Sequence, residues 1–204
     1  MSTRIKLCGM TRPQDVRLAV ELGVDYIGLV LARSARQLST AQARALRELI
    51  PDSIGAVALV MDPGPAELAA IAEQVRPDLI QFHGQEDDAA CAAAGLPFLK
   101  ALPMGAGLQA ETAMPAFPSA WGFVLDSHAP GGAGGSGKTF DWSRYPHKAA
   151  RPCLLAGGLT AATVAAAIAA AQPWGVDVSG GIESAPGHKD PEAMRRFVAA
   201  VRAA

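Results

Sequence analysis

The sequence predicts an α/β protein of the (β/α)8 (TIM) barrel class, near the minimum length for that fold at 204 residues. Eight short apolar segments alternate with segments of helical periodicity, which is the pattern of repeated βα units. The apolar segments are continuous, as expected for parallel strands that are covered on both faces. An open doubly wound sheet would show the same alternation, but a count of eight favours closure. No linker or shift in composition appears, so we expect residues 1–204 to form a single barrel domain.

Each apolar segment ends at a glycine or a polar residue, such as Gly9 after the first and His83 after the fourth. These terminators set the strand boundaries, because short runs of four to eight apolar residues between such signals are typical of buried strands. The expected strands are residues 5–8, 26–31, 54–60, 79–82, 98–102, 122–125, 153–156 and 174–178.

Start signals and apolar stripes place the helices between the strands. Thr11 with Pro13 offers a cap and a first-turn proline, Thr160 is expected to cap a later helix, and Asp190 with Pro191 opens the last one. Stripes at helical spacing are Val16, Ala19 and Val20; Leu68, Ile71, Ala72 and Val75; Val164, Ala167, Ile168 and Ala171; and Met194, Phe197, Val198 and Val201. Further helices are expected near residues 39–49 and 87–94, an irregular one over 104–118, and at most a single turn at 140–145.

Composition narrows the class of protein. The net charge is −1 and no basic patch appears, so neither nucleic acid nor an anionic membrane is an expected partner. Three cysteines without a Cys-x-x-Cys spacing argue against disulfides and structural zinc. No signal peptide and no apolar run of about 18 residues is visible. We therefore predict a soluble, cytoplasmic protein.

Polar residues and glycines follow the expected strands at the end where barrel enzymes carry their active sites. They are Cys8 after strand one, Arg36 past strand two, His83 after strand four, Asp126 after strand six, Gly157 and Gly158 after strand seven, and Asp177, Ser179, Gly180 and Gly181 at strand eight. Two glycine pairs let backbone N–H groups approach a phosphate closely. The implied ligand is a phosphorylated small molecule.

Each of these residues also has a purely structural interpretation. A free cysteine is most often a small buried hydrophobe, although Cys8 stands at a strand end before a glycine. Asp126 would serve as a cap, but no helix follows it. Arg36 and His83 would be rim residues paired with carboxylates. Cys91 and Cys153 are predicted to be structural.

Residues 132–139 match the phosphate-loop pattern of nucleotide triphosphatases, Gly, four residues and Gly-Lys-Thr. Such a loop must run from a strand directly into a helix. Six residues, Asp126 to Gly131, separate the strand from the pattern, and Pro146 forbids a long helix after it. A glycine-rich loop matches the pattern by composition, so the triphosphatase remains an alternative distinguished by magnesium dependence.

Several motifs together carry a resemblance that covers the whole chain in order. They are Lys6-Leu7-Cys8-Gly9-Met10-Thr11, Gln81-Phe82-His83-Gly84, Leu125-Asp126-Ser127, Pro130-Gly131-Gly132, Gly137-Lys138-Thr139-Phe140-Asp141-Trp142, Leu155-Ala156-Gly157-Gly158-Leu159, Asp177-Val178-Ser179, Gly181-Ile182-Glu183, Gly187 and Lys189-Asp190. With these motifs the chain resembles the phosphoribosylanthranilate isomerases, (β/α)8 enzymes of tryptophan biosynthesis.

The resemblance implies an Amadori rearrangement of N-(5-phosphoribosyl)anthranilate without metal or cofactor. Asp126 would be the general acid that opens the ribose ring, and Cys8 the general base that removes the C2 proton. A base works best with a pKa near the ambient pH, and a thiol begins at about 8.5. The acid must hold its proton, so we expect burial under the glycine-rich loop to raise the pKa of Asp126.

The resemblance also assigns the binding residues. Arg36 would contact the anthranilate carboxylate, and His83 and Asp177 other parts of the substrate. The phosphate would be bound by Gly157, Gly158, Ser179, Gly180 and Gly181. Ala35 stands where the family usually has proline, and Gly180 where serine is commoner, which removes a side-chain donor but keeps the backbone site.

Two further alternatives come from other classes. Another phosphosugar isomerase on the same barrel would use paired carboxylates as acid and base, and Cys8 in place of a second aspartate speaks against it. A phosphate-binding protein without catalytic activity would need neither Cys8 nor Asp126.

Overall fold

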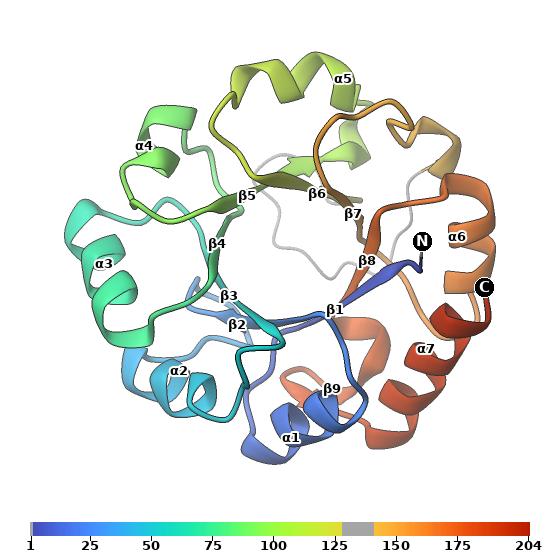
Figure 1. Ribbon diagram of the computed structural model, residues 1–204, viewed down its shortest axis with the longest axis horizontal. Coiled ribbons are helices and arrows are strands. Elements are labelled where there is room, and N and C mark those ends of the chain that lie inside the picture. The colour runs from blue at the N-terminus through green and yellow to red at the C-terminus, as the bar shows by residue number, and fades with distance from the viewer. Residues whose placement is uncertain (1, 128–140) are drawn as a thin grey trace.

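The computed structural model describes residues 2–127 and 141–204. Its parallel strands close into a barrel in the order β1 to β8, with β8 paired to β1, and helices surround it (Figure 1). The barrel strands are β1 (Arg4–Cys8), β2 (Tyr26–Val30), β3 (Gly55–Val60), β4 (Leu79–Phe82), β5 (Phe98–Pro103), β6 (Gly122–Asp126), β7 (Cys153–Leu155) and β8 (Gly175–Val178). The predicted fold class is confirmed, and each strand lies within about one residue of its expected range.

The helices lie outside the barrel. They are α1 (Pro13–Glu21), α2 (Thr40–Arg47), α3 (Pro65–Ala70), which continues as a π-helical turn (Ile71–Val75), α4 (Asp88–Ala92), α5 (Ala110–Ala113), α6 (Val164–Ala171) and α7 (Pro191–Ala203). Short 3-10 turns are Met104–Ala106, Met114–Ala116, Trp142–Arg144 and Gly180–Ile182. As predicted, the segment after β5 is irregular, and the described residues between β6 and β7 form only the turn Trp142–Arg144.

Two predicted helix caps are wrong. The N-cap of α6 is Thr163, because the carbonyl of Thr160 accepts the N–H of Thr163 at 3.1 Å and forms a turn before the helix. The N-cap of α1 is Arg12, while the hydroxyl of Thr11 donates to the carbonyl of Gly187. The hydroxyl of Thr160 lies 3.1 Å from that of Thr163, so in both cases the threonine side chain bonds to a group other than a backbone N–H of the first helical turn.

No sequence signal indicates the small hairpin that lies between β8 and α7. Strands β9 (Glu183–Ala185) and β10 (His188–Lys189) pair antiparallel there. They are too short and too polar to show the alternation by which strands are recognised. This hairpin brings Glu183 and Lys189 to the mouth of the barrel.

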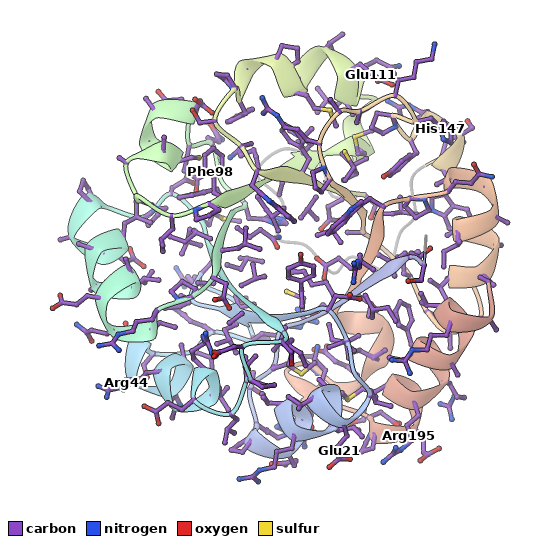
Figure 2. All side chains as sticks on the ribbon, viewed as in Figure 1. Glu21, Arg44, Phe98, Glu111, His147 and Arg195 are labelled. Atoms are coloured by element: carbon purple, nitrogen blue, oxygen red, sulfur yellow. The ribbon has the colours of Figure 1, made fainter. Side chains whose placement is uncertain are left out.

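Side chains fill the two layers of the core, one between strands and helices and one inside the barrel (Figure 2). The inner layer consists of Val57, Leu79, Leu99, Ala101, Val124, Leu154 and Ala156. Tyr26, Trp121 and Trp174 pack beneath it at the start of three strands, with ring centroids 5.6–6.3 Å apart. These rings fill the amino end of the barrel, opposite the carboxyl ends of the strands.

Candidate active site

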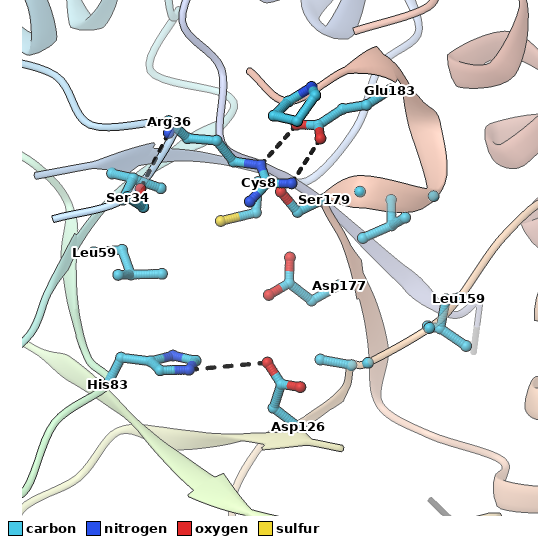
Figure 3. Close-up of a pocket in the computed structure, with 18 of the residues that line it drawn as sticks. Cys8, Ser34, Arg36, Leu59, His83, Asp126, Leu159, Asp177, Ser179 and Glu183 are labelled. Atoms are coloured by element: carbon cyan, nitrogen blue, oxygen red, sulfur yellow. Dashed lines mark hydrogen bonds and ion pairs between the residues drawn. The ribbon is translucent and has the colours of Figure 1, made fainter. Parts of the chain in front are cut away.

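A pocket of about 580 Å³ lies at the carboxyl ends of the strands (Figure 3). Every residue predicted for the site lines this pocket: Cys8, Arg36, His83, Asp126, Gly157, Gly158, Asp177, Ser179, Gly180 and Gly181. They come from β1, the β2–α2 connection, the ends of β4 and β6, the turn after β7, strand β8 and the turn after it. The structure therefore brings the whole predicted set into one cavity.

Cys8 is the last residue of β1, and its side chain points into the pocket (Figure 3). Gly28 on the neighbouring strand β2 is its direct partner in the sheet register. A Cβ at position 28 would lie 2.6 Å from the thiol sulfur, inside contact distance. The glycine therefore leaves the space that the Cys8 side chain occupies.

Charged groups surround this thiol. Lys6, two residues earlier on β1, is completely buried, and its Nζ donates to Oδ2 of Asp177 at 2.8 Å. Burial alone lowers the pKa of Lys6, but the attraction of Asp177 and Cys8 outweighs it and raises that pKa. Burial raises the pKa of Cys8 and the negative charge of Asp177 adds to the rise, while the positive charges of Lys6 and Lys189 oppose it. The two buried lysines therefore favour the thiolate against the effect of burial.

On the opposite side of the pocket, His83 faces Asp126 at the end of β6 (Figure 3). Nε2 of His83 lies 3.9 Å from Oδ2 of Asp126, and both side chains are almost fully buried. Nδ1 of His83 is 3.4 Å from Nε2 of Gln81 on the same strand. With the amide of Gln81 as donor to Nδ1, the ring carries its proton on Nε2, toward Asp126.

Arg36 is held by Glu183 of the β9–β10 hairpin. Its Nε and terminal nitrogen donate to the two carboxylate oxygens at 2.7 and 2.6 Å. Lys189, also buried, donates to the same carboxylate at 2.8 Å and to the carbonyl of Ser179 at 3.1 Å. Burial raises the pKa of Glu183, but the hydrogen bonds from Arg36 and Lys189 outweigh it and hold that pKa below its ordinary value. The hairpin fixes the direction of the arginine.

The two glycine turns pack against their surroundings at close range. Gly157 and Gly158 adopt φ of +88° and +65°, the left-handed region that favours glycine. A Cβ at Gly157 would lie 2.1 Å from the Ser127 hydroxyl, and one at Gly181 would lie 1.8 Å from the carbonyl oxygen of Leu159. The turn after β8 therefore touches the turn after β7, and the two form one continuous backbone surface.

The other two cysteines have no access to this pocket. Cys91 and Cys153 are buried, and burial raises the pKa of each thiol to about 12. This agrees with the structural role predicted for both.

The phosphate-loop pattern at residues 132–139 and the glycine-rich loop predicted to cover Asp126 lie outside the described residues, so the structure tests neither. The first element described after them is the 3-10 turn Trp142–Arg144, not the long helix that such a nucleotide loop requires. Within residues 2–127 and 141–204, no group of three or more His, Cys, Asp or Glu side chains is placed to hold a metal ion. Across the same ranges, no helix has the length and apolar character needed to span a bilayer.

The chain matches the family model of N-(5'-phosphoribosyl)anthranilate isomerase over residues 5–200. It belongs to this family. The N-(5'-phosphoribosyl)anthranilate isomerase of Xanthomonas campestris pv. campestris is 53% identical over 209 aligned residues, which cover 99% of this chain and 94% of the relative.

Solved structures of this isomerase family share the fold. The enzyme from Thermus thermophilus superposes with a TM-score of 0.88 at 30% identity, over 98% of this chain and 99% of that one. A second isomerase, crystallised with reduced 1-(o-carboxyphenylamino)-1-deoxyribulose 5-phosphate, has a TM-score of 0.81 at 27% identity, over 99% of this chain and 100% of that one. The predicted family and its barrel are thereby confirmed, which removes the triphosphatase alternative.

Four residues in or next to the pocket of this isomerase have no role that their sequence positions predict: Lys6, Gln81, Glu183 and Lys189. A signal existed for the first two, because each is a single polar residue inside an apolar strand segment, where a polar side chain is unfavourable without a partner. Glu183 and Lys189 lie on the hairpin that the sequence did not reveal. Their partners are distant in the sequence.

Proposed function

We propose that the pocket catalyses the Amadori rearrangement of N-(5-phosphoribosyl)anthranilate to 1-(2-carboxyphenylamino)-1-deoxyribulose 5-phosphate, with Asp126 as general acid and Cys8 as general base. The observation that carries this proposal is the position of a thiol and a carboxyl group on opposite sides of one pocket (Figure 3). An aldose-to-ketose rearrangement needs both an acid and a base within reach of adjacent carbons.

The first step opens the sugar ring. The carboxyl of Asp126 gives its proton to the ring oxygen as the C1–O bond breaks, and the lone pair of the anthranilate nitrogen forms the C1=N bond. His83, 3.9 Å from Asp126, orients this carboxyl. A positioned acid of this kind typically contributes about 10²–10⁴ in rate.

The second step moves the proton at C2. The Cys8 thiolate takes this proton, the C–H electron pair becomes the C1=C2 bond, and the nitrogen recovers its lone pair. The resulting enolamine tautomerises to the ketone when C1 takes up a proton and the C2 hydroxyl loses its own, so that the C1=C2 pair forms the new C1–H bond and the O–H pair forms the C2=O bond. Lys6 and Lys189 support the step, because their charges favour the thiolate against the effect of burial.

The remaining pocket residues hold the two charged ends of the substrate. Arg36, fixed by Glu183, binds the anthranilate carboxylate. The turns at Gly157, Gly158, Gly180 and Gly181, with Ser179, bind the phosphate through backbone N–H groups. His83 and Asp177 contact the sugar between them. A cytoplasmic monomer or homodimer is part of the proposal.

The test follows the loss of phosphoribosylanthranilate fluorescence, with substrate generated in situ and EDTA present. We expect rapid turnover by the wild type and a loss of at least about 10²-fold in both Cys8→Ser and Asp126→Asn. Circular dichroism confirms that the variants are folded. No turnover by a folded wild-type protein would overturn the proposal, and a full requirement for magnesium would contradict catalysis by these side chains alone.

A further inference from the structure

Two buried oxygen atoms face the pocket without a hydrogen-bond partner among the described residues. They are Oε1 of Gln81 on β4 and Oδ1 of Asp177 on β8. The two residues are 1% and 7% exposed, and both line the cavity. Buried polar groups in folded proteins are nearly always hydrogen-bonded, so each exception calls for an explanation.

The fold does not require a polar side chain at position 81. The backbone of Gln81 pairs in register with Leu59 on β3 and Leu99 on β5. Its side chain lies on the inner face of the barrel, where Leu79 of the same strand is part of an apolar cluster. Its amide nitrogen has one distant neighbour, Nδ1 of His83 at 3.4 Å, and its oxygen is left for the cavity.

The unpaired oxygen of Asp177 is also available to a neutral donor. Oδ2 of this carboxylate accepts from the buried Lys6 at 2.8 Å, which balances its charge. The remaining oxygen therefore has no need of a second cation. A hydroxyl group is a suitable partner, since it donates one hydrogen bond without bringing charge into a buried site.

We propose that Gln81 Oε1 and Asp177 Oδ1 form a pair of acceptors for two sugar hydroxyls of the substrate, and that Gln81 thereby selects a hydroxylated phosphosugar. This inference rests on the proposed function, which supplies a ribose between the phosphate and the anthranilate group. The anionic ends of the substrate are bound elsewhere, by Arg36 and the glycine turns. The hydroxyls are the groups left to satisfy these oxygens.

The experiment uses Gln81→Met, which keeps the length of the side chain and removes its polar atoms. Because an unpaired buried acceptor disappears, we expect its resistance to urea to equal or exceed that of the wild type. We expect kcat/KM to fall at least about tenfold, since the site loses an acceptor built for a hydroxyl. Leu79→Met, on the same inner face but outside the pocket lining, is the matched control and should leave kinetics unchanged.

Binding measurements separate a role in sugar recognition from a structural one. We expect Gln81→Met to bind reduced 1-(o-carboxyphenylamino)-1-deoxyribulose 5-phosphate at least about tenfold more weakly, and inorganic phosphate as well as the wild type does. Deoxy versions of the reduced compound, one for each sugar hydroxyl, give a second test on the wild type alone. At least one should bind about tenfold more weakly than the parent, and Gln81→Met should not distinguish that version from the parent.

Three results would overturn the inference. Gln81→Met could be less stable than the wild type with unchanged kinetics, which indicates a packing role only. It could bind the reduced compound as the wild type does. Or the wild type could bind all deoxy versions equally. The proposed function fails separately, when a folded wild type neither turns over the substrate nor binds the reduced compound.

Discussion

The buried ion pair between Lys6 and Asp177 allows a sharp prediction for Lys6→Met. The two side chains are 0% and 8% exposed, and their charged atoms are 2.8 Å apart. Removing one partner of such a pair leaves a buried charge and typically destabilises a protein by about 3–5 kcal/mol. Total stabilities are about 5–15 kcal/mol, so the loss is a large fraction of the whole. For a chain of this size it corresponds to a Tm lower by roughly 6–20 °C.

The loss of stability in Lys6→Met should increase as the pH rises. Burial raises the pKa of Asp177, and Lys6 is the main group opposing the rise. In Lys6→Met the positive charge of Lys6 is gone, so the pKa of Asp177 in the folded protein rises further. In the unfolded chain an aspartate has a pKa of about 3.9. Above that pH the folded variant therefore holds a proton on Asp177 that the unfolded chain has lost. Its free energy of unfolding therefore falls as the pH increases from about 4 toward neutrality. The deficit relative to the wild type is largest near pH 7.

The assay is urea denaturation at pH 5 and pH 7 for the wild type, Lys6→Met and the double variant Lys6→Met/Asp177→Leu. Replacing both members of a buried pair by apolar groups is often neutral or stabilising, so the double variant should recover most of the loss. A Lys6→Met protein as stable as the wild type would refute the reasoning. So would a double variant that is no more stable than Lys6→Met.

Two further predictions concern activity. Glu183→Gln removes the negative charge that fixes Arg36. We therefore expect KM for phosphoribosylanthranilate to rise about tenfold, with a much smaller change in kcat. A loss confined to kcat in steady-state kinetics would contradict this expectation. Because burial raises the pKa of the Cys8 thiol, kcat/KM and the rate of Cys8 alkylation by iodoacetamide should both increase as the pH is raised from 7 to 9. Peptide mass spectrometry should find Cys91 and Cys153 unmodified over that range, and an alkylation rate that does not change with pH would exclude the expected titration of Cys8.

The barrel was predictable because its strands follow simple local rules. Continuous apolar runs between glycine or polar terminators, such as the run that ends before His83, place the strands to within about one residue. The two incorrect caps depended on tertiary contacts instead. Thr11 bonds to Gly187, 176 positions away, which no local signal at the helix start reveals.

The residues of the site were predictable as a set, but their pairings were not. Strand ends of a barrel meet at one mouth, so Cys8 and Asp126 could be placed together from topology alone. The pairing of Arg36 with Glu183 spans 147 positions and that of Lys6 with Asp177 spans 171. A single lysine in an apolar strand indicates that a buried carboxylate partner exists, but it does not identify that carboxylate.

Asp177 acts on both the proposed base and the proposed acid. Its negative charge adds to the effect of burial and raises the pKa of Cys8, while Lys6 and Lys189 oppose that rise. Asp177 also repels the carboxylate of Asp126, which raises the pKa of Asp177 itself. Lys6 offsets part of this negative charge through its 2.8 Å ion pair with Asp177. Lys6 therefore favours the Cys8 thiolate both directly and by balancing the charge of Asp177.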